Sequence, residues 1–275
     1  MAQSLPEIAT ATSGFDELSH GIANSLLAAL PRDDYQRLLG ELEEVTLTSR
    51  EVLYEPGERI GHVYFPNEGQ VSLWMVMADR KALEVGLIGH EGMVGVPLAQ
   101  GVEVSPVRAV VQGSGRALRM DAASFRKALG RSRPLRYEVS RYAYAELSQA
   151  RQIAVCARFH EVEARLAFRL LMARDSVRAD KFHLTHEFLA EMLGIRRVGI
   201  TNAASALQRR KLISYSRGNI RILDRKGLRA AACECYEVLR KLARIPLLMS
   251  NAVPAQTPDQ SAPAASITAG VLLPA

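Results

Sequence analysis

The feature that most constrains this chain is a sharp turn between two amphipathic helical runs within residues 184–213. The first run starts at Thr185, whose hydroxyl can cap a first helical turn, and it carries an apolar stripe. Gly194 ends the run, because glycine adopts the left-handed backbone conformation that a tight turn requires. A second helix is predicted to start around Arg196 and Arg197. Its apolar positions are expected to be Val198, Ala203, Ala206 and Leu207.

The second helix presents polar side chains on its other face. They are Arg196, Arg197, Thr201, Asn202 and Ser205. Arginine, asparagine and small hydroxyl side chains on an exposed helix can reach base edges in the major groove of DNA. The same pattern also suits an ordinary surface helix with a solvated basic face. Periodicity alone therefore leaves both interpretations open.

A short hairpin pattern follows the second helix and favours the nucleic-acid interpretation. Gly218-Asn219 between two alternating runs predicts a hairpin tip, which would complete a winged helix-turn-helix. Residues 175–225 hold ten basic and five acidic side chains, a net charge of +5 in a chain whose formal net charge is +6. Such a local excess suits phosphate neutralisation. The predicted DNA-binding residues are Thr185, His186, Arg196, Arg197, Thr201, Asn202, Ser205, Arg217 and Arg221.

Length and composition set broad limits. The 275 residues, 48% of them hydrophobic, are enough for two modest domains with cores of their own. No apolar run reaches the roughly 18 residues that a membrane-spanning helix needs. The first residues lack the basic and apolar regions of a secretory signal, so we expect a cytoplasmic protein.

The chain has three cysteines, Cys156, Cys233 and Cys235, an odd number in a chain too large to need disulfides. Cys233 and Cys235 fall in a predicted helix over residues 227–242, where residues two apart point in different directions. No disulfide or metal site is therefore predicted.

Residues 43–120 change to short runs separated by glycine-containing turns. The predicted strands are 45–47, 51–54, 62–66, 70–77, 83–87, 107–112 and 116–120. Strands of this length and spacing are typical of a compact antiparallel barrel or roll. The glycine patterns of dinucleotide-binding and nucleotide-hydrolysing loops do not occur in the chain.

A long helical pattern runs from about residue 135 to near 156, after a short helix at 122–130. Its apolar and small residues recur at intervals of three and four: Val139, Tyr142, Ala143, Leu147, Ala150, Ile153 and Ala154. One interpretation is packing against the chain's own barrel. We favour a two-fold seam with the same helix of a second subunit, because helix-turn-helix proteins read paired half-sites.

Together these patterns predict an α+β protein. An N-terminal antiparallel, jelly-roll-like β-roll is followed by a long dimerisation helix and a C-terminal winged helix-turn-helix. The predicted segments are a disordered stretch 1–20, a sensory roll 21–130, the long helix 131–158, a DNA-binding domain 159–245 and a disordered tail 246–275.

This order of parts resembles the Crp/Fnr family of bacterial transcription regulators over about residues 22–242. The resemblance rests on EPGERIGHVYFPNEGQVSLW, IGHEGMVGVP and LTHEFLAEMLGIRRVGITNAASALQRRKLI. It implies a cyclic-nucleotide-binding-like roll that senses a small-molecule effector, and a homodimer that binds a pseudo-palindromic operator and contacts RNA polymerase. It places the start of the recognition helix at Arg196, Arg197 and Val198, with a further base contact at Asn202. In the family an acid is frequent at the position of Val198, and an arginine is frequent at the position of Asn202. The base preference of this chain is therefore expected to differ from that of the best-known members.

The sensory half departs from the family's cyclic-nucleotide binders. The resemblance places the phosphate-binding cassette at Gly95 and Val96, where those members carry Gly-Glu, and the nearest arginine is Arg108, about two positions late. The glutamate that accepts from the ribose and the arginine that neutralises the cyclic phosphate are thus not in place. Gly95, Val96 and Arg108 remain the predicted ligand pocket, and no cofactor is predicted. The N-terminal cysteine cluster of the iron–sulfur members is also missing from this sequence.

The predicted function is a sequence-specific transcription regulator without catalytic activity. The alternative is a ligand-binding module whose helix-turn-helix makes protein contacts only, and the clustered arginines argue against it. An enzyme is not supported. His186-Glu187 and His160-Glu161 lack the second histidine of HExxH, and no GxSxG frames a nucleophile.

Overall fold

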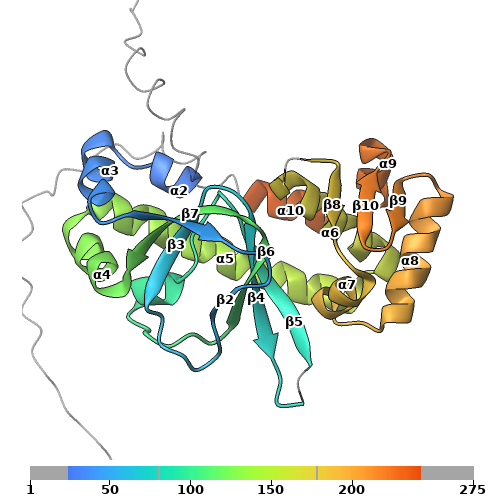
Figure 1. The fold of residues 1–275 in the computed structure, drawn as a ribbon, viewed down its shortest axis with the longest axis horizontal. Helices are drawn as coiled ribbons and strands as arrows, with labels where there is room; N and C mark the ends of the chain where they lie inside the picture. The colour runs from blue at the N-terminus through green and yellow to red at the C-terminus, as the bar shows by residue number, and fades with distance from the viewer. Residues whose placement is uncertain (1–23, 80, 178, 243–275) are drawn as a thin grey trace, which may run out of the picture.

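The computed structural model describes residues 24–79, 81–177 and 179–242. The predicted terminal segments 1–20 and 246–275 lie outside these ranges. Two domains lie side by side along the long axis of the molecule, and helix α5 (Arg133–Phe159) runs from one to the other (Figure 1). Within the described ranges, no helix is both long and apolar enough to cross a membrane.

Among the described residues, the N-terminal domain forms a roll of seven strands in two antiparallel sheets. The strand orders are β1-β7-β3 and β2-β6-β4-β5. The bounds are β1 Glu43–Leu47, β2 Val52–Tyr54, β3 His62–Pro66, β4 Gln70–Val76, β5 Ala82–Ile88, β6 Arg108–Gly113 and β7 Gly115–Asp121. The predicted strands are thus confirmed to within two residues at each end. Glycine-containing turns and short apolar runs are local signals, so they locate strands well.

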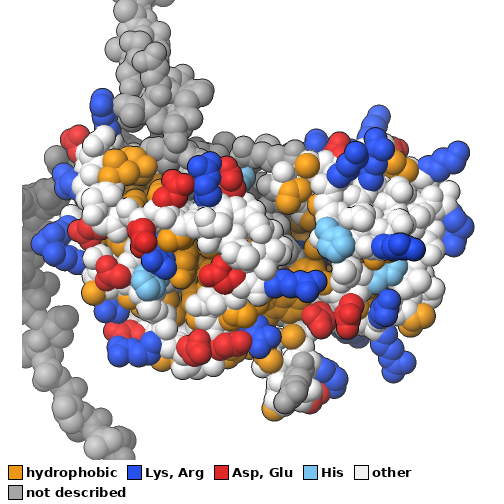
Figure 2. All heavy atoms as spheres, in the orientation of Figure 1, with side chains coloured by type: hydrophobic (Ala, Val, Ile, Leu, Met, Phe, Trp, Pro, Cys, Tyr) orange, Lys and Arg blue, Asp and Glu red, His pale blue; other side chains and the backbone are white. Residues whose placement is uncertain are grey.

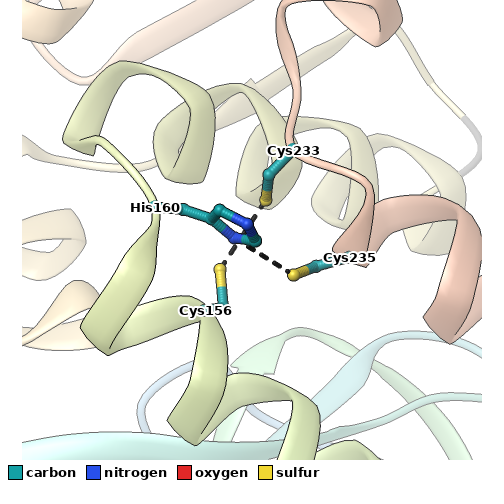
Figure 3. Close-up of side chains that lie close together, drawn as sticks. All are labelled: Cys156, His160, Cys233 and Cys235. Carbon is teal, nitrogen blue, oxygen red and sulfur yellow. Dashed lines mark hydrogen bonds between the residues drawn. The ribbon is translucent and has the colours of Figure 1, made fainter.

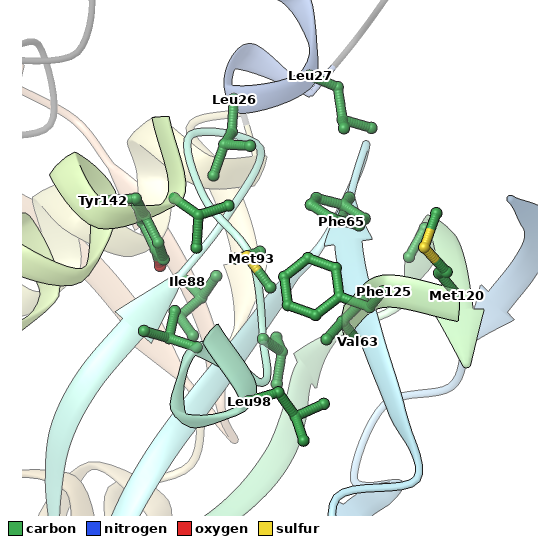
Figure 4. Packing of buried hydrophobic residues seen from close by; sticks show 14 of the residues in the cluster. Leu26, Leu27, Val63, Phe65, Ile88, Met93, Leu98, Met120, Phe125 and Tyr142 are labelled. Atoms are coloured by element: carbon green, nitrogen blue, oxygen red, sulfur yellow. The ribbon is translucent and has the colours of Figure 1, made fainter. Parts of the chain in front are cut away.

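Short helices close the roll around its core. They are α2 (Ser25–Ala28), α3 (Arg32–Leu39), the 3₁₀ helix η1 (Val96–Gln100) and α4 (Ala122–Arg131). Met93, Phe65 and Phe125 lie at the centre of the core and are almost completely buried (Figure 4). The rings of Phe65 and Phe125 meet edge to face, with centroids 6.4 Å apart. This packing holds the loop before η1 against the strands.

Helix α5 is fixed to the roll by named contacts. Ser132 caps it by accepting a hydrogen bond from the Leu135 amide at 3.1 Å. Further along, the Gln149 side chain accepts from the Leu87 amide at 3.1 Å and donates to the Leu87 carbonyl at 3.2 Å. The helix therefore leaves the roll in a defined direction.

The C-terminal domain joins helices to a small antiparallel sheet of order β8-β10-β9. Its elements are α6 Val162–Val177, β8 Lys181–His183, α7 His186–Leu193, α8 Arg197–Arg209, β9 Ile213–Ser216, β10 Asn219–Ile222, α9 Arg225–Ala231 and α10 Cys235–Leu242. Strand β8 is absent from the sequence prediction, because three residues are too few to show an alternating pattern.

The predicted single helix over residues 227–242 is wrong. The chain breaks after α9 at Ala232, whose backbone is extended with ψ of 152°, and resumes as α10. The break has a packing reason, since α9 lies against α6 whereas α10 lies mainly against α5. A single straight helix could not pack against both α6 and α5.

The two domains share a continuous interface. Trp74 of β4 packs against Phe188 of α7, with ring centroids 5.7 Å apart. Glu84 of β5 and Arg169 of α6 form an ion pair of 2.6 Å whose side chains are 2% and 6% exposed. Trp74 belongs to the same buried hydrophobic cluster as the core of the C-terminal domain. The C-terminal domain is thus docked on the β4–β5 side of the roll.

Candidate functional site

The helix-turn-helix forms as predicted. Thr185 Oγ1 accepts a hydrogen bond from the Phe188 amide at 3.2 Å and caps α7. Gly194 ends α7 with a φ of 62°, the left-handed conformation that favours glycine. Arg196 then provides the N-cap position of α8. Thr185 thus fixes the start of α7 and the entry into the motif.

Helix α8 has one buried face and one exposed face. The buried residues are Ile200, Ala203, Ala204 and Leu207. The exposed face carries Arg197, Val198, Thr201 and Asn202, with Ser205 half-buried at its edge. The predicted interior position of Val198 is wrong, because its side chain is 62% exposed. Ile200 takes its place in the core. Val198 and Asn202 are four residues apart, so they lie one turn from each other on the outer face.

Two predicted DNA-binding residues, His186 and Thr201, make contacts with other residues of the same domain. The His186 ring stacks on Tyr215 of β9, with centroids 4.0 Å apart. Its Nδ1 lies 3.1 Å from Thr201 Oγ1, which also donates to the Arg197 carbonyl. Burial, and then the charge of Arg197, lower the pKa of His186, so the ring is neutral at pH 7. His186 and Thr201 therefore fix α7, α8 and the hairpin relative to one another.

The hairpin of β9 and β10 forms the wing. Its two loop residues are Arg217 and Gly218, between the paired residues Ser216 and Asn219. The predicted tip at Gly218-Asn219 is therefore one residue late. Both loop residues have positive φ, 49° and 85°, as a two-residue turn matched to the twist of a hairpin requires. The Arg217 side chain in this turn is exposed.

The positive charge is divided between paired and free arginines. Figure 2 shows Lys and Arg side chains along the outer edge of the C-terminal domain. Arg210 pairs with Glu163 and Arg225 pairs with Asp175, at 2.6 and 3.2 Å. Within the part of the chain that the structure describes, five exposed arginines of α8, its N-cap and the wing have no ion-pair partner. They are Arg196, Arg197, Arg209, Arg217 and Arg221.

A hollow of about 870 Å³ lies between the roll and α5. Of the predicted pocket residues, Gly95 and Val96 line this hollow and Arg108 does not. Arg108 lies on the far side of β6 and bonds to Glu55 at 2.7 Å, facing the C-terminal domain. The predicted pocket is wrong in this residue, because family spacing placed it on the wrong face of its strand.

The hollow contains an unexpected acidic group. Glu146 of α5 lines it, and burial raises the pKa of this carboxyl from its ordinary 4.5 to about 7. The lining guanidinium is that of Arg136, which donates to the carbonyls of Leu129 and Gly130. An anionic ligand would therefore meet a carboxyl group, and an arginine that already has partners.

The predicted seam on α5 is only partly at the surface. Val139 and Tyr142 are 1% and 6% exposed and belong to the core of the roll. Of the other predicted seam residues, Ala143, Ala150 and Ile153 are half-buried, whereas Leu147 and Ala154 are exposed. Val139 and Tyr142 are therefore corrected to intramolecular contacts, as in the alternative interpretation of the pattern.

A different apolar face of α5 is exposed. Its residues are Tyr137, Tyr144, Leu147, Val155 and Phe159. At 100° per residue they fall within about 120° of the helix circumference. The sequence pattern conceals this face, because α5 has two apolar faces and the buried one gives the stronger periodicity.

The three cysteines come together, although the sequence placed Cys233 and Cys235 on different sides of one helix. Cys156 lies in the last turn of α5, Cys233 lies in the break between α9 and α10, and Cys235 begins α10. The Sγ atoms of Cys156 and Cys233 are 3.6 Å apart. The sequence signal for this cluster is Cys156 and His160 at helical spacing, with a Cys-x-Cys pair at the end of the domain.

Two family models match the chain. Residues 44–132 match the cyclic nucleotide-binding domain, and residues 164–231 match the Crp-like helix-turn-helix domain. No curated protein matches the chain.

Solved structures of regulators share the fold. FixK2 from Bradyrhizobium japonicum is 16% identical, with a TM-score of 0.60 over 70% of this chain and 98% of its own. A regulator assigned to the Crp/Fnr family, from Eubacterium rectale, is 17% identical, with a TM-score of 0.61 over 76% and 98%. The c-di-GMP-responsive global regulator CLP from Xanthomonas campestris is 17% identical, with a TM-score of 0.59 over 70% and 99%.

These structures establish the likeness of fold, and the two domain models occur in the order found in such regulators. The chain therefore carries a cyclic nucleotide-binding domain followed by a Crp-like helix-turn-helix domain, and it shares its fold with regulators of the Crp/Fnr family.

Proposed function

We propose that this protein is a sequence-specific DNA-binding regulator rather than an enzyme. In this proposal it binds a pseudo-palindromic operator as a homodimer, responds to a signal sensed by the roll, and acts on transcription through RNA polymerase. The observation that carries the proposal is the row of exposed arginines without ion-pair partners on α8 and the wing, among the residues that the structure describes. A face for protein contacts has no need of such a cluster.

The exposed face of α8 supports base readout in the major groove. Arg197 lies in the first turn, where a guanidinium can bond to guanine O6 and N7. Val198 offers a methyl-bearing surface that suits the methyl group of thymine. Asn202 lies one turn further along and can reach an adenine or a phosphate. Arg217 and Arg221 on the wing are better placed for phosphates.

The second apolar face of α5 supports the homodimer. Phe159 and Tyr144 are 72% and 58% exposed, which is costly for large apolar side chains in a lone chain. A second copy of α5 would cover them, and a two-fold pair of helix-turn-helix domains would match an operator with two half-sites.

The composition of the hollow supports an effector other than a cyclic nucleotide. Burial leaves the Glu146 carboxyl, with its pKa raised to about 7, only about half ionised at pH 7, and Arg108 is held by Glu55 outside the hollow. An uncharged or cationic small molecule fits such a lining better than a cyclic phosphate does.

The test is selection of binding sites from random duplexes at fixed salt, with the wild type, Arg197→Ala and Arg217→Ala. The wild type should select a two-fold symmetric site. Arg197→Ala should lose about 1–3 kcal/mol of discrimination at one base pair per half-site. Arg217→Ala should weaken binding to all sequences alike, and should lower the salt slope by about one for each phosphate that Arg217 neutralises.

Arg240→Ala is the matched control, because Arg240 pairs with Glu237 on α10 and should leave selection unchanged. Two results would contradict the proposal. One is a wild-type protein that enriches no sequence. The other is an Arg197→Ala variant that keeps the full base preference, which would remove α8 as the reading helix.

A further inference from the structure

The cluster of Cys156, His160, Cys233 and Cys235 has the makeup of a metal site (Figure 3). Cys156 and His160 are four residues apart at the end of α5, so they share one face of the helix. Cys233 and Cys235 come from the break between α9 and α10, far along the chain. All three cysteines of this 275-residue chain therefore meet one histidine at a single point.

The distances suit one tetrahedral ion. The Sγ atoms of Cys156 and Cys233 are 3.6 Å apart, and Cys235 Sγ lies 3.4 Å from His160 Nδ1. All four donor atoms lie within 4.8 Å of one another. Sulfurs bound at about 2.3 Å to a tetrahedral zinc ion are about 3.8 Å apart, whereas the sulfurs of a disulfide are about 2.0 Å apart. In an iron–sulfur cluster the ligands bind different iron atoms, so the donors lie further apart than around a single ion.

The surroundings orient the donors. The His160 Nε2 atom lies 3.2 Å from Glu234 Oε1, so Nε2–H can donate to the carboxylate and leave the Nδ1 lone pair facing the sulfurs. Gln152 Nε2 donates to Cys235 Sγ at 3.0 Å. Carboxylate–histidine–metal contacts and amide donors to sulfur are the usual supports of metal-bound groups. The three thiols are 8% exposed or less, so water does not compete for them.

The geometry points to a Cys₃His site for a single Zn²⁺ ion that clamps the α9–α10 break to the end of α5. The site lies at His160, where α5 ends and the chain turns into α6. An ion there links the last helices of the DNA-binding domain to the helix that leaves the sensory roll. The inference concerns metal binding alone, so it stands independently of the proposed operator binding.

The test begins with metal analysis of the full-length protein purified with reductant. About one zinc ion per chain is expected. After removal of zinc by a chelator, Co²⁺ should bind with the intense thiolate-to-cobalt absorption of a tetrahedral sulfur site. Cys235→Ser and His160→Gln should reduce Co²⁺ affinity at least tenfold, and Glu234→Gln should weaken it by about tenfold. Chelation should lower the unfolding temperature of the wild type and restore thiol reactivity, and added zinc should reverse both changes.

His183→Gln is the matched control, because His183 is exposed and bonds to Asn219 outside the cluster. It should bind Co²⁺ like the wild type. The chelation and zinc re-addition arm needs no variant, so misfolding of a cysteine variant cannot hide the result. Any of three results would overturn the site: no bound metal with three freely reactive thiols, a Cys156–Cys233 disulfide, or iron accompanied by sulfide.

Discussion

Arg169→Met should weaken the junction between the two domains, because it leaves Glu84 buried without its counter-ion. The Glu84 carboxylate accepts from Arg169 at 2.6 Å and from Ser72 Oγ at 2.9 Å, and its side chain is 2% exposed. Loss of one partner of such a pair costs about 3–5 kcal/mol in the free energy of unfolding. Burial raises the pKa of Glu84, and Arg169 opposes that rise. The loss should therefore be smaller at acid pH, where the unpaired carboxyl can take up a proton.

A built-in probe reports on this junction. Trp74 is the only tryptophan of the chain, lies 5% exposed at the interface and packs on Phe188. Urea unfolding followed by tryptophan fluorescence reads the docking of the domains, and circular dichroism reads the helices and strands. We expect the fluorescence transition of Arg169→Met to move to lower urea.

The double variant Glu84→Leu with Arg169→Met separates burial of a lone charge from loss of packing. Because it removes both charges, it should recover most of the stability lost in the single variant. Arg116→Met is the control, since the pair of Arg116 with Glu68 is more than half exposed and solvent screening should leave it with little effect on stability. The ion pair would not hold the domains together if Arg169→Met lowered the free energy of unfolding no more than this control does. The same conclusion would follow if the losses caused by Glu84→Leu and by Arg169→Met were simply additive in the double variant.

Two further predictions concern the hollow beside α5. Glu146→Gln should raise the free energy of unfolding by roughly 3 kcal/mol at about pH 8 and by little at about pH 4, as measured by urea titration. The sign follows because the folded pKa of about 7 exceeds the ordinary 4.5, so ionisation of Glu146 destabilises the fold as pH rises through that window. An equal gain at both pH values would refute the assignment. Cyclic AMP should leave the unfolding temperature unchanged, and a saturable rise would instead show that the hollow accepts a cyclic phosphate.

The sequence predicts those parts of the structure whose signals are local. The seven strands of the roll follow from short runs between glycine-containing turns. Thr185 and Gly194 mark the ends of α7, because a cap and a left-handed turn each depend on one residue type. The same reasoning fails at Val198, since an apolar residue near a helix start can face either way and only the packed core decides.

Features that depend on distant partners could not be predicted. The Glu84–Arg169 pair joins residues of different domains, and nothing near either residue in the sequence marks the other. The convergence of Cys156 with Cys233 depends on a helix break whose cause is the packing of α10 on α5. Arg108 shows the limit of family spacing, because side chains alternate between the two faces of a strand and the spacing of a motif does not set which face Arg108 takes on β6.

The hollow and the exposed face of α5 are not separate features. Tyr144 and Leu147 line the hollow, and both also belong to the exposed apolar face of the helix. A small molecule in the hollow would contact the same side chains that a second copy of α5 would cover in the proposed dimer. By linkage, a ligand that binds the dimer more tightly than the monomer must strengthen the dimer by the same factor. In the proposed dimer, a signal sensed in the hollow would therefore reach the paired helix-turn-helix domains through α5 itself, without a separate relay between the roll and the helix-turn-helix.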